Sequence, residues 1–193
     1  MTVKYTYKWN DYRTEKKYAR ELINEKCIII SQHSDTAGPA TACEETASDV
    51  PVFNVSYNQS MFDVAPTTYL TGCNINWKPY MKAAVDAVLN GKVIEKNIRG
   101  NIHGNDVGAG FDEDWVSMLE FNDIVVADGT KEMVADVIEQ FKKGRLTVFK
   151  GDYTGVNTDN PNDIIDLNEG FVENKDSSAP SFNYILKDII TIE

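Results

Sequence analysis

The feature of this sequence that most constrains its fold is a regular alternation of short apolar runs with amphipathic segments over the first two-thirds of the chain. Strands are predicted at residues 3–7, 27–31, 51–56, 68–73 and 147–149, and helices at residues 11–25, 38–47, 76–89 and 131–141. The run at residues 27–31 is continuously apolar, which is typical of a strand buried on both faces. Strand–helix–strand alternation with short connections predicts an α/β fold: a three-layer, doubly wound, mainly parallel sheet covered by helices.

The composition of the chain changes at Gly151. A chain of 193 residues is long enough to bury one substantial core, and residues 1–150 are expected to form one α/β lobe. Residues 151–193 are polar and rich in turn residues, and three short apolar stretches in them suggest edge strands or a docked tail. We expect them to form a loop-rich extension packed on the same lobe.

Composition excludes several classes of partner. Thirty acidic residues stand against 19 basic ones, a net charge of −11 that opposes binding to nucleic acid. No apolar run is long enough to span a bilayer, and the first residues lack the apolar core of a signal peptide, so any export signal is expected upstream. Three widely spaced cysteines without histidine partners favour packed thiols over a redox or metal site.

Catalytic patterns are weak throughout the sequence. His33, Ser34 and Asp35 are adjacent on one predicted loop, where a catalytic triad rarely forms, and the G-x-S-x-G motif is absent. His103 has no second metal ligand at a regular spacing, and the acidic run at residues 112–114 lacks the EF-hand pattern. We therefore expect no enzyme activity, no metal and no cofactor; an enzyme of unknown class that uses His33 and Asp35 remains a third hypothesis.

Polar and aromatic side chains gather where three predicted strands end. These residues are Trp9 and Asp11 after the first strand, His33 and Asp35 after the second, and Ser56, Tyr57 and Asn58 after the third. Because the carboxyl ends of parallel strands meet at one edge of a sheet, this is a plausible rim for a small polar ligand. The alternative is that they are caps and turn residues, and Asp11 in particular has the sequence position of a helix N-cap.

Four segments carry a family resemblance in order and spacing. They are Lys8-Trp9-Asn10-Asp11 before a helix, Gln32-His33-Ser34-Asp35-Thr36, Val55-Ser56-Tyr57-Asn58-Gln59-Ser60, and the stretch from Leu70 to Tyr80. They resemble the S-[WF]-x-D, H-H-T-D-S, G-x-D-S-D-Q-S and L-T-S-x-x-x-N-W-G-P-Y segments of the basic-membrane-protein family. This is a family of substrate-binding lipoproteins of ABC transporters that includes the purine nucleoside receptors.

The resemblance implies a lobe of the type I periplasmic-binding-protein fold that binds without catalysis. Trp9 matches the aromatic side chain that stacks on the purine, and Ser56, Asn58, Asn105 and Asp106 match positions near the sugar. Ser56 and Asn58 replace the usual aspartates, which weakens the nucleoside inference but leaves side chains able to hydrogen-bond hydroxyls.

The resemblance also implies partners. Family members carry another lobe before the point where this chain begins, and the helix at residues 76–90 is expected to pack on that lobe or to self-associate. The parent protein is implied to be an extracytoplasmic, membrane-anchored lipoprotein that serves an ABC permease. The alternative function is a sensing or protein-interaction module that retains the fold without transport.

Overall fold

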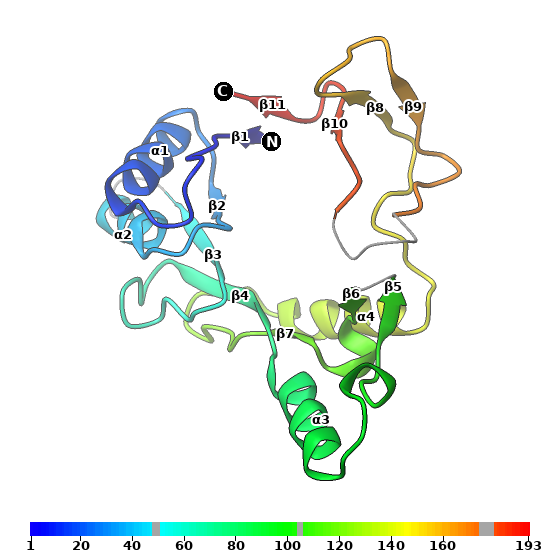
Figure 1. Cartoon of the computed structure of the whole chain (residues 1–193). Helices are drawn as coiled ribbons and strands as arrows, with labels where there is room; N and C mark the ends of the chain where they lie inside the picture. The colour runs from blue at the N-terminus through cyan, green and yellow to red at the C-terminus, as the bar shows by residue number, and fades with distance from the viewer. Residues whose placement is uncertain (48–50, 104–105, 174–179) are drawn as a thin grey trace. The chain divides into compact units, whose positions relative to one another are not determined.

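The structure is a computed structural model that describes residues 1–47, 51–103, 106–173 and 180–193 (Figure 1). It divides into two compact units. Unit 1 contains Met1–Ile75, Ser117–Met133 and Thr191–Glu193, and unit 2 contains Asn76–Val116 and Val134–Ile190. The expected boundary at residue 150, and the packing of residues 151–193 on the preceding lobe, stay predictions.

Unit 1 is built around a sheet with the strand order β2-β3-β4-β7. Its strands are β2 (Ile29–Ser31), β3 (Phe53–Tyr57), β4 (Tyr69–Ile75) and β7 (Val116–Met118). The first three are parallel, with Ile30 opposite Asn54 and Val55 opposite Thr71. The predicted α/β fold with a parallel sheet is therefore confirmed, and β7 is a strand that the sequence pattern did not reveal.

Two helices cover this sheet, α1 (Tyr12–Asn24) and α2 (Gly38–Thr46), which pack on each other and beside β2 and β3 (Figure 1). Ala19 and Ile23 lie one helical turn apart on α1, so both face the sheet. They meet Ile30 of β2 and a buried group from α2 and its flank: Ala42, Cys43 and Val52. A second buried cluster contains Ala40, Met61, Ala65 and Tyr69.

The prediction that β2 is buried on both faces is wrong. Ile30 is buried, but Ile29 is 57% exposed and Ile28 is 56% exposed. The reason is that Ile29 and Ile30 point to opposite faces of the strand, and α1 and α2 pack on the face of Ile30. β1 (Thr2–Val3) pairs in parallel with β11 (Thr191–Ile192), so β2 also lies at the edge of its sheet. The predicted first strand at residues 3–7 is correspondingly reduced to β1, and the chain from Lys4 onward has no strand pairing before α1.

Unit 2 contains helices and small antiparallel sheets. Its helices are α3 (Lys78–Leu89) and the 3-10 helices η1 (Ile94–Lys96) and η2 (Phe111–Glu113). A hairpin is formed by β5 (Asn101–His103) and β6 (Asp106–Gly108). A second sheet, in the order β10-β8-β9, contains β8 (Thr154–Asn157), β9 (Ile164–Asp166) and β10 (Tyr184–Leu186). The remaining helix, α4 (Thr130–Lys142), begins in unit 1 and continues in unit 2.

Two predictions in this region are wrong. Residues 147–149 form no strand; Phe149 instead stacks on Phe182, with ring centroids 4.2 Å apart, so its apolar character serves an aromatic cluster. β8 lies inside the stretch expected to be a polar loop. It is a strand because its backbone pairs with β9 and β10, and this pairing has no signal in the local sequence. Of the helices described, none combines the length and the apolar character that a membrane span requires.

Candidate functional site

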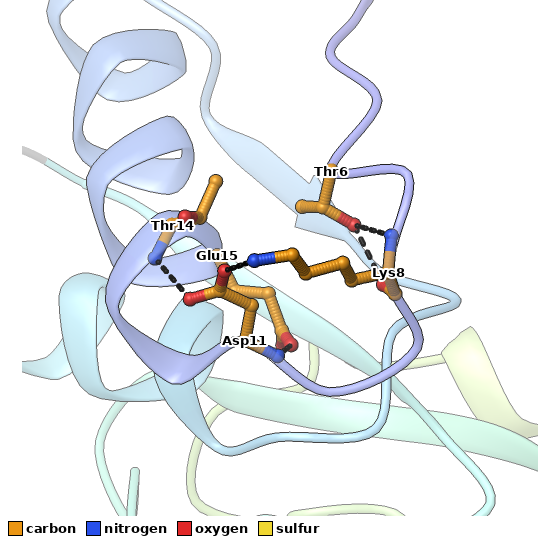
Figure 2. Close-up of polar contacts among 5 residues, drawn as sticks. All are labelled: Thr6, Lys8, Asp11, Thr14 and Glu15. Atoms are coloured by element: carbon orange, nitrogen blue, oxygen red, sulfur yellow. Dashed lines mark hydrogen bonds and ion pairs between the residues drawn. The ribbon is translucent and has the colours of Figure 1, made fainter.

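Asp11 caps helix α1 and is fully engaged by the residues around it (Figure 2). Its Oδ1 accepts a hydrogen bond from the Thr14 amide at 3.2 Å, and its Oδ2 lies 2.9 Å from the Lys8 ammonium. Both contacts hold the pKa of the Asp11 carboxyl below its ordinary value, first through the Lys8 hydrogen bond and then through the Thr14 amide. Asp11 therefore acts as a helix cap in this conformation, which matches the alternative that its sequence position suggested.

Glu15 lies one turn into α1 and is a buried carboxylate, only 2% exposed. Its Oε1 accepts from the Asp11 amide at 2.8 Å, a return contact that closes the cap (Figure 2). Its Oε2 accepts from the Thr36 amide at 3.2 Å and from the Thr36 hydroxyl at 2.5 Å. One side chain thus connects the start of α1 to the loop that follows β2.

That loop, residues 32–36, is also held by the side chain of its own first residue, Gln32. The Gln32 side chain is buried, and its Nε2 donates to the carbonyls of Ser34 at 3.0 Å and Thr36 at 2.8 Å. Asn54 of β3 donates from Nδ2 to the Gln32 Oε1 at 3.4 Å and to the Ile30 carbonyl at 3.2 Å. These contacts fix the conformation of the loop, although the buried Asn54 Oδ1 has no hydrogen-bond partner among the described residues.

Trp9 and Asp35 are joined through their backbones. The Asp35 amide donates to the Trp9 carbonyl at 2.8 Å, which places the segment before α1 beside the loop after β2. Both residues are exposed, Trp9 to 74%. Within the part of the chain that the structure describes, the Asp35 carboxylate has no ion-pair partner.

His33 and Tyr57 form a second aromatic surface. Their rings are stacked with centroids 5.1 Å apart and planes inclined by 23°. The rings meet because Tyr57 ends β3 and His33 follows the neighbouring parallel strand β2. His33 is exposed and Tyr57 is half-buried. The predicted gathering of side chains at this edge therefore occurs for His33, with Tyr57 as its partner.

Ser56 and Asn58 are used by the turn after β3. Ser56 is buried, and its hydroxyl donates to the Gln59 carbonyl at 2.6 Å. Asn58 has a left-handed backbone, with φ of 61°, and its Oδ1 accepts from the Ile75 amide at 3.1 Å. Ser56 is covered within the turn, whereas Asn58 is exposed. Asn105 lies outside the described residues, and Asp106 begins β6 in unit 2.

Sequence reasoning missed the residues that support this site. Glu15, Gln32 and Asn54 contribute no surface to a ligand, and Tyr57 was noted only as part of a strand end. The spacing of Asp11 and Glu15 carried no usable signal, because a capping box has its glutamate three residues after the N-cap and Glu15 lies four residues after Asp11. The contact of Glu15 with Thr36 joins residues 21 positions apart and has no local signature.

A separate groove of about 600 Å³ lies within unit 2. It is lined by α3, by residues 97–99 and by the acidic run at residues 112–114 with Trp115. No predicted site residue lines it. In the described ranges, with residues 48–50, 104–105 and 174–179 set aside, no three metal-ligating side chains are grouped to hold an ion.

Unit 1 presents aromatic and acidic side chains near the carboxyl ends of its strands. The Trp9 indole is exposed, His33 and Tyr57 are stacked, and the exposed Asp35 carboxylate is chemically able to accept hydrogen bonds. Helix α2, which follows the loop, starts at Gly38, whose amide donates to the Thr36 hydroxyl at 3.1 Å; its N-cap residue, Ala37, provides no side-chain cap.

Comparisons of sequence and of fold with known proteins both find substrate-binding proteins of ABC transporters. A family model described as ABC transporter substrate-binding protein PnrA-like matches residues 1–146. A purine-binding protein of Brucella abortus (strain 2308) is 29% identical over 143 residues, which is 74% of this chain and 37% of the relative. The chain thus spans little more than a third of that curated relative.

Two solved structures share the fold. A transcriptional activator of the comK gene from Bacillus halodurans matches with a TM-score of 0.54 at 21% identity, over 75% of this chain and 47% of the other. An ABC transporter solute-binding protein from Conexibacter woesei matches with a TM-score of 0.56 at 15% identity, over 75% of this chain and 44% of the other. At these identities the likeness concerns the fold alone.

Proposed function

Because the chain belongs to the PnrA-like family of ABC transporter substrate-binding proteins, we propose that it captures a small polar molecule, specifically a purine nucleoside, without catalysis. The observation that carries this proposal is the exposed Trp9 indole, held beside Asp35 by the backbone hydrogen bond between the two residues. An indole provides a stacking face for a base, and stacking of this kind contributes about 1–3 kcal/mol per base. The purine-binding relative supports the choice of a purine over a sugar.

In this proposal the polar contacts divide between two strand ends. The free carboxylate of Asp35 accepts hydrogen bonds from ribose hydroxyls, a task that Asp11 does not share because helix capping and Lys8 already engage it. His33 and Asn58, both exposed at the carboxyl ends of β2 and β3, complete the rim. Ser56, Asn105 and Asp106 belong to the proposed site through the family resemblance only.

The remainder of the parent protein supplies the rest of the machinery. We propose that a second lobe precedes this chain, that closure of the two lobes traps the ligand, and that the parent is an extracytoplasmic lipoprotein which delivers the ligand to an ABC permease. Helix α3 exposes an apolar stripe at Trp77, Met81, Val85 and Val88. In the parent, this stripe is the surface that the second lobe covers.

A second function is favoured by the same stripe. An apolar helix face that receives a regulatory partner instead of a lobe would make the protein a sensing module that retains the fold. Both uses leave the Trp9 site in place, so the ligand and the partner of α3 are separate questions.

A thermal-shift screen tests the nucleoside proposal. Inosine, guanosine and adenosine are expected to raise the unfolding temperature, because a ligand at 100 times its dissociation constant adds about 2.7 kcal/mol to the free energy of unfolding. Trp9→Ala is expected to abolish the rise, whereas Trp77→Ala, a control that removes another exposed indole, is expected to keep it. Absence of a rise both in this chain and in a two-lobed parent would exclude purine nucleosides.

A further inference from the structure

Glu15 is buried at a point where a charge is costly. Transferring a carboxylate out of water is unfavourable unless hydrogen bonds compensate, and an apolar residue at such a position often leaves stability unchanged or improves it. Helix capping alone does not require a buried group, because Asp11 already caps α1 from a partly exposed position. The burial of Glu15 is therefore better explained by the segments that its carboxylate holds together than by helix capping.

Every hydrogen-bond donor that contacts the Glu15 carboxylate belongs to a segment that carries a proposed ligand residue. The Asp11 amide, bonded to Oε1, lies two residues after Trp9. The Thr36 amide and hydroxyl, bonded to Oε2, lie directly after Asp35 and three residues after His33. The Thr36 hydroxyl also accepts from the Gly38 amide at 3.1 Å, which carries the connection into the first turn of α2.

We infer that Glu15 is a positioning residue: its carboxylate locks the Trp9 segment against the 32–36 loop and so sets the geometry of the stacking and hydroxyl-binding groups. This inference rests on the proposed function for its effect on ligand affinity, but not for the contacts themselves. Gln32 cooperates from the opposite side, because its Nε2 donates to the Thr36 carbonyl while Glu15 accepts from the Thr36 amide.

The test replaces the carboxylate while keeping its size. In Glu15→Gln an NH₂ donor group replaces one of two oxygens that each accept from a backbone amide, so at least one contact is lost. We expect inosine to bind about tenfold more weakly, as for the loss of a hydrogen bond to a charged group. The matched control is Glu21→Gln on the same helix, whose carboxylate is 37% exposed and pairs with lysines; it is expected to bind inosine as the wild type does.

A spectroscopic readout separates positioning from general destabilisation. In the folded chain, the amide protons of Asp11 and Thr36 are expected downfield in the NMR spectrum because both donate to a carboxylate, and both should move upfield in Glu15→Gln but not in Glu21→Gln. Thr36→Val, which removes only the hydroxyl, should weaken inosine binding, and Thr36→Ser should restore it relative to Thr36→Val. These variants keep the test available if Glu15→Gln folds poorly.

The outcomes distinguish this inference from the proposed function. If the wild-type chain and its two-lobed parent bind no nucleoside, the proposed function fails, while the two amide signals still decide whether Glu15 holds the loop. If the amide signals stay at their wild-type positions in Glu15→Gln, the inference is overturned. It is equally overturned if they move while the affinity of a binding-competent chain for inosine stays within about twofold of the wild type.

Discussion

Asp35 and Asp11 show how two carboxylates in similar sequence positions acquire different roles. Both follow a predicted strand end, and both were predicted as ligand contacts, with helix capping as the alternative for Asp11. The structure engages Asp11 with Lys8 and the Thr14 amide, and it leaves the Asp35 carboxylate exposed after fixing only its backbone. The N-cap role of Asp11 could be predicted because capping depends on neighbouring residues, whereas the anchoring of Asp35 depends on a contact with Trp9, 26 residues earlier.

Asp35→Asn is expected to discriminate between a nucleoside and its base. The substitution removes the charge that strengthens hydrogen bonds to ribose hydroxyls, so inosine should bind about tenfold more weakly. Hypoxanthine, which lacks the sugar, should bind as it does to the wild type. Isothermal titration with both compounds measures this difference, with Asp63→Asn in the loop after β3 as the control for the change in net charge. Equal losses for the two compounds would show that Asp35 does not contact the sugar.

At the scale of elements, the strands were less predictable than the helices. The helices α1, α3 and α4 agree with the predicted ranges to within two residues, because their apolar spacing and caps are local properties. The exposure of β2 could not be predicted, since it depends on long-range packing: α1 and α2 cover the face that carries Ile30 and leave Ile29 exposed. β7 was missed for the same reason: its place beside β4 is a matter of long-range pairing.

Lys4 connects the paired ends of unit 1. Its ammonium lies 2.8 Å from Glu193 and within 3.4 Å of the carboxylates of Glu21 on α1 and of Glu25, the C-cap residue of α1. The Lys4 hydrogen bond holds the pKa of the Glu193 carboxyl below its ordinary value. A carboxyl whose folded pKa is depressed contributes stability above its unfolded pKa, and that contribution is lost as the pH falls through the folded pKa.

Acidification is therefore expected to loosen the pairing of β1 with β11. The amides of Thr191 and Glu193, which donate to the carbonyls of Met1 and Val3, should lose hydrogen-exchange protection relative to their intrinsic rates as the pH falls through the Glu193 pKa. Lys4→Gln should show the low protection already at neutral pH. Protection that is independent of pH in the wild type would contradict the role given to Lys4.

At the scale of the whole molecule, the chain matches about a third of its purine-binding relative and exposes the apolar stripe of α3. An exposed apolar surface of this kind favours association with another surface. We expect the chain to sediment as a concentration-dependent oligomer in analytical ultracentrifugation. The variant Met81→Lys with Val85→Glu should be monomeric, whereas the matched charge changes Lys82→Glu with Asp86→Lys on the polar face should leave association unchanged. A wild-type chain that is monomeric at high concentration would contradict the proposed docking role of α3.

The central claim is that a purine nucleoside stacks on Trp9, and a chain in which Trp9 is the sole tryptophan tests it most directly. Trp77→Phe with Trp115→Phe keeps aromatic rings at both other positions, including the edge contact between Trp115 and Tyr80. Titration of this variant with inosine is predicted to quench the Trp9 fluorescence along a saturable curve whose midpoint agrees with the dissociation constant from calorimetry. Calorimetric binding with unchanged Trp9 fluorescence would place the ligand elsewhere. If neither this variant nor a two-lobed parent binds inosine, nucleoside capture itself is contradicted.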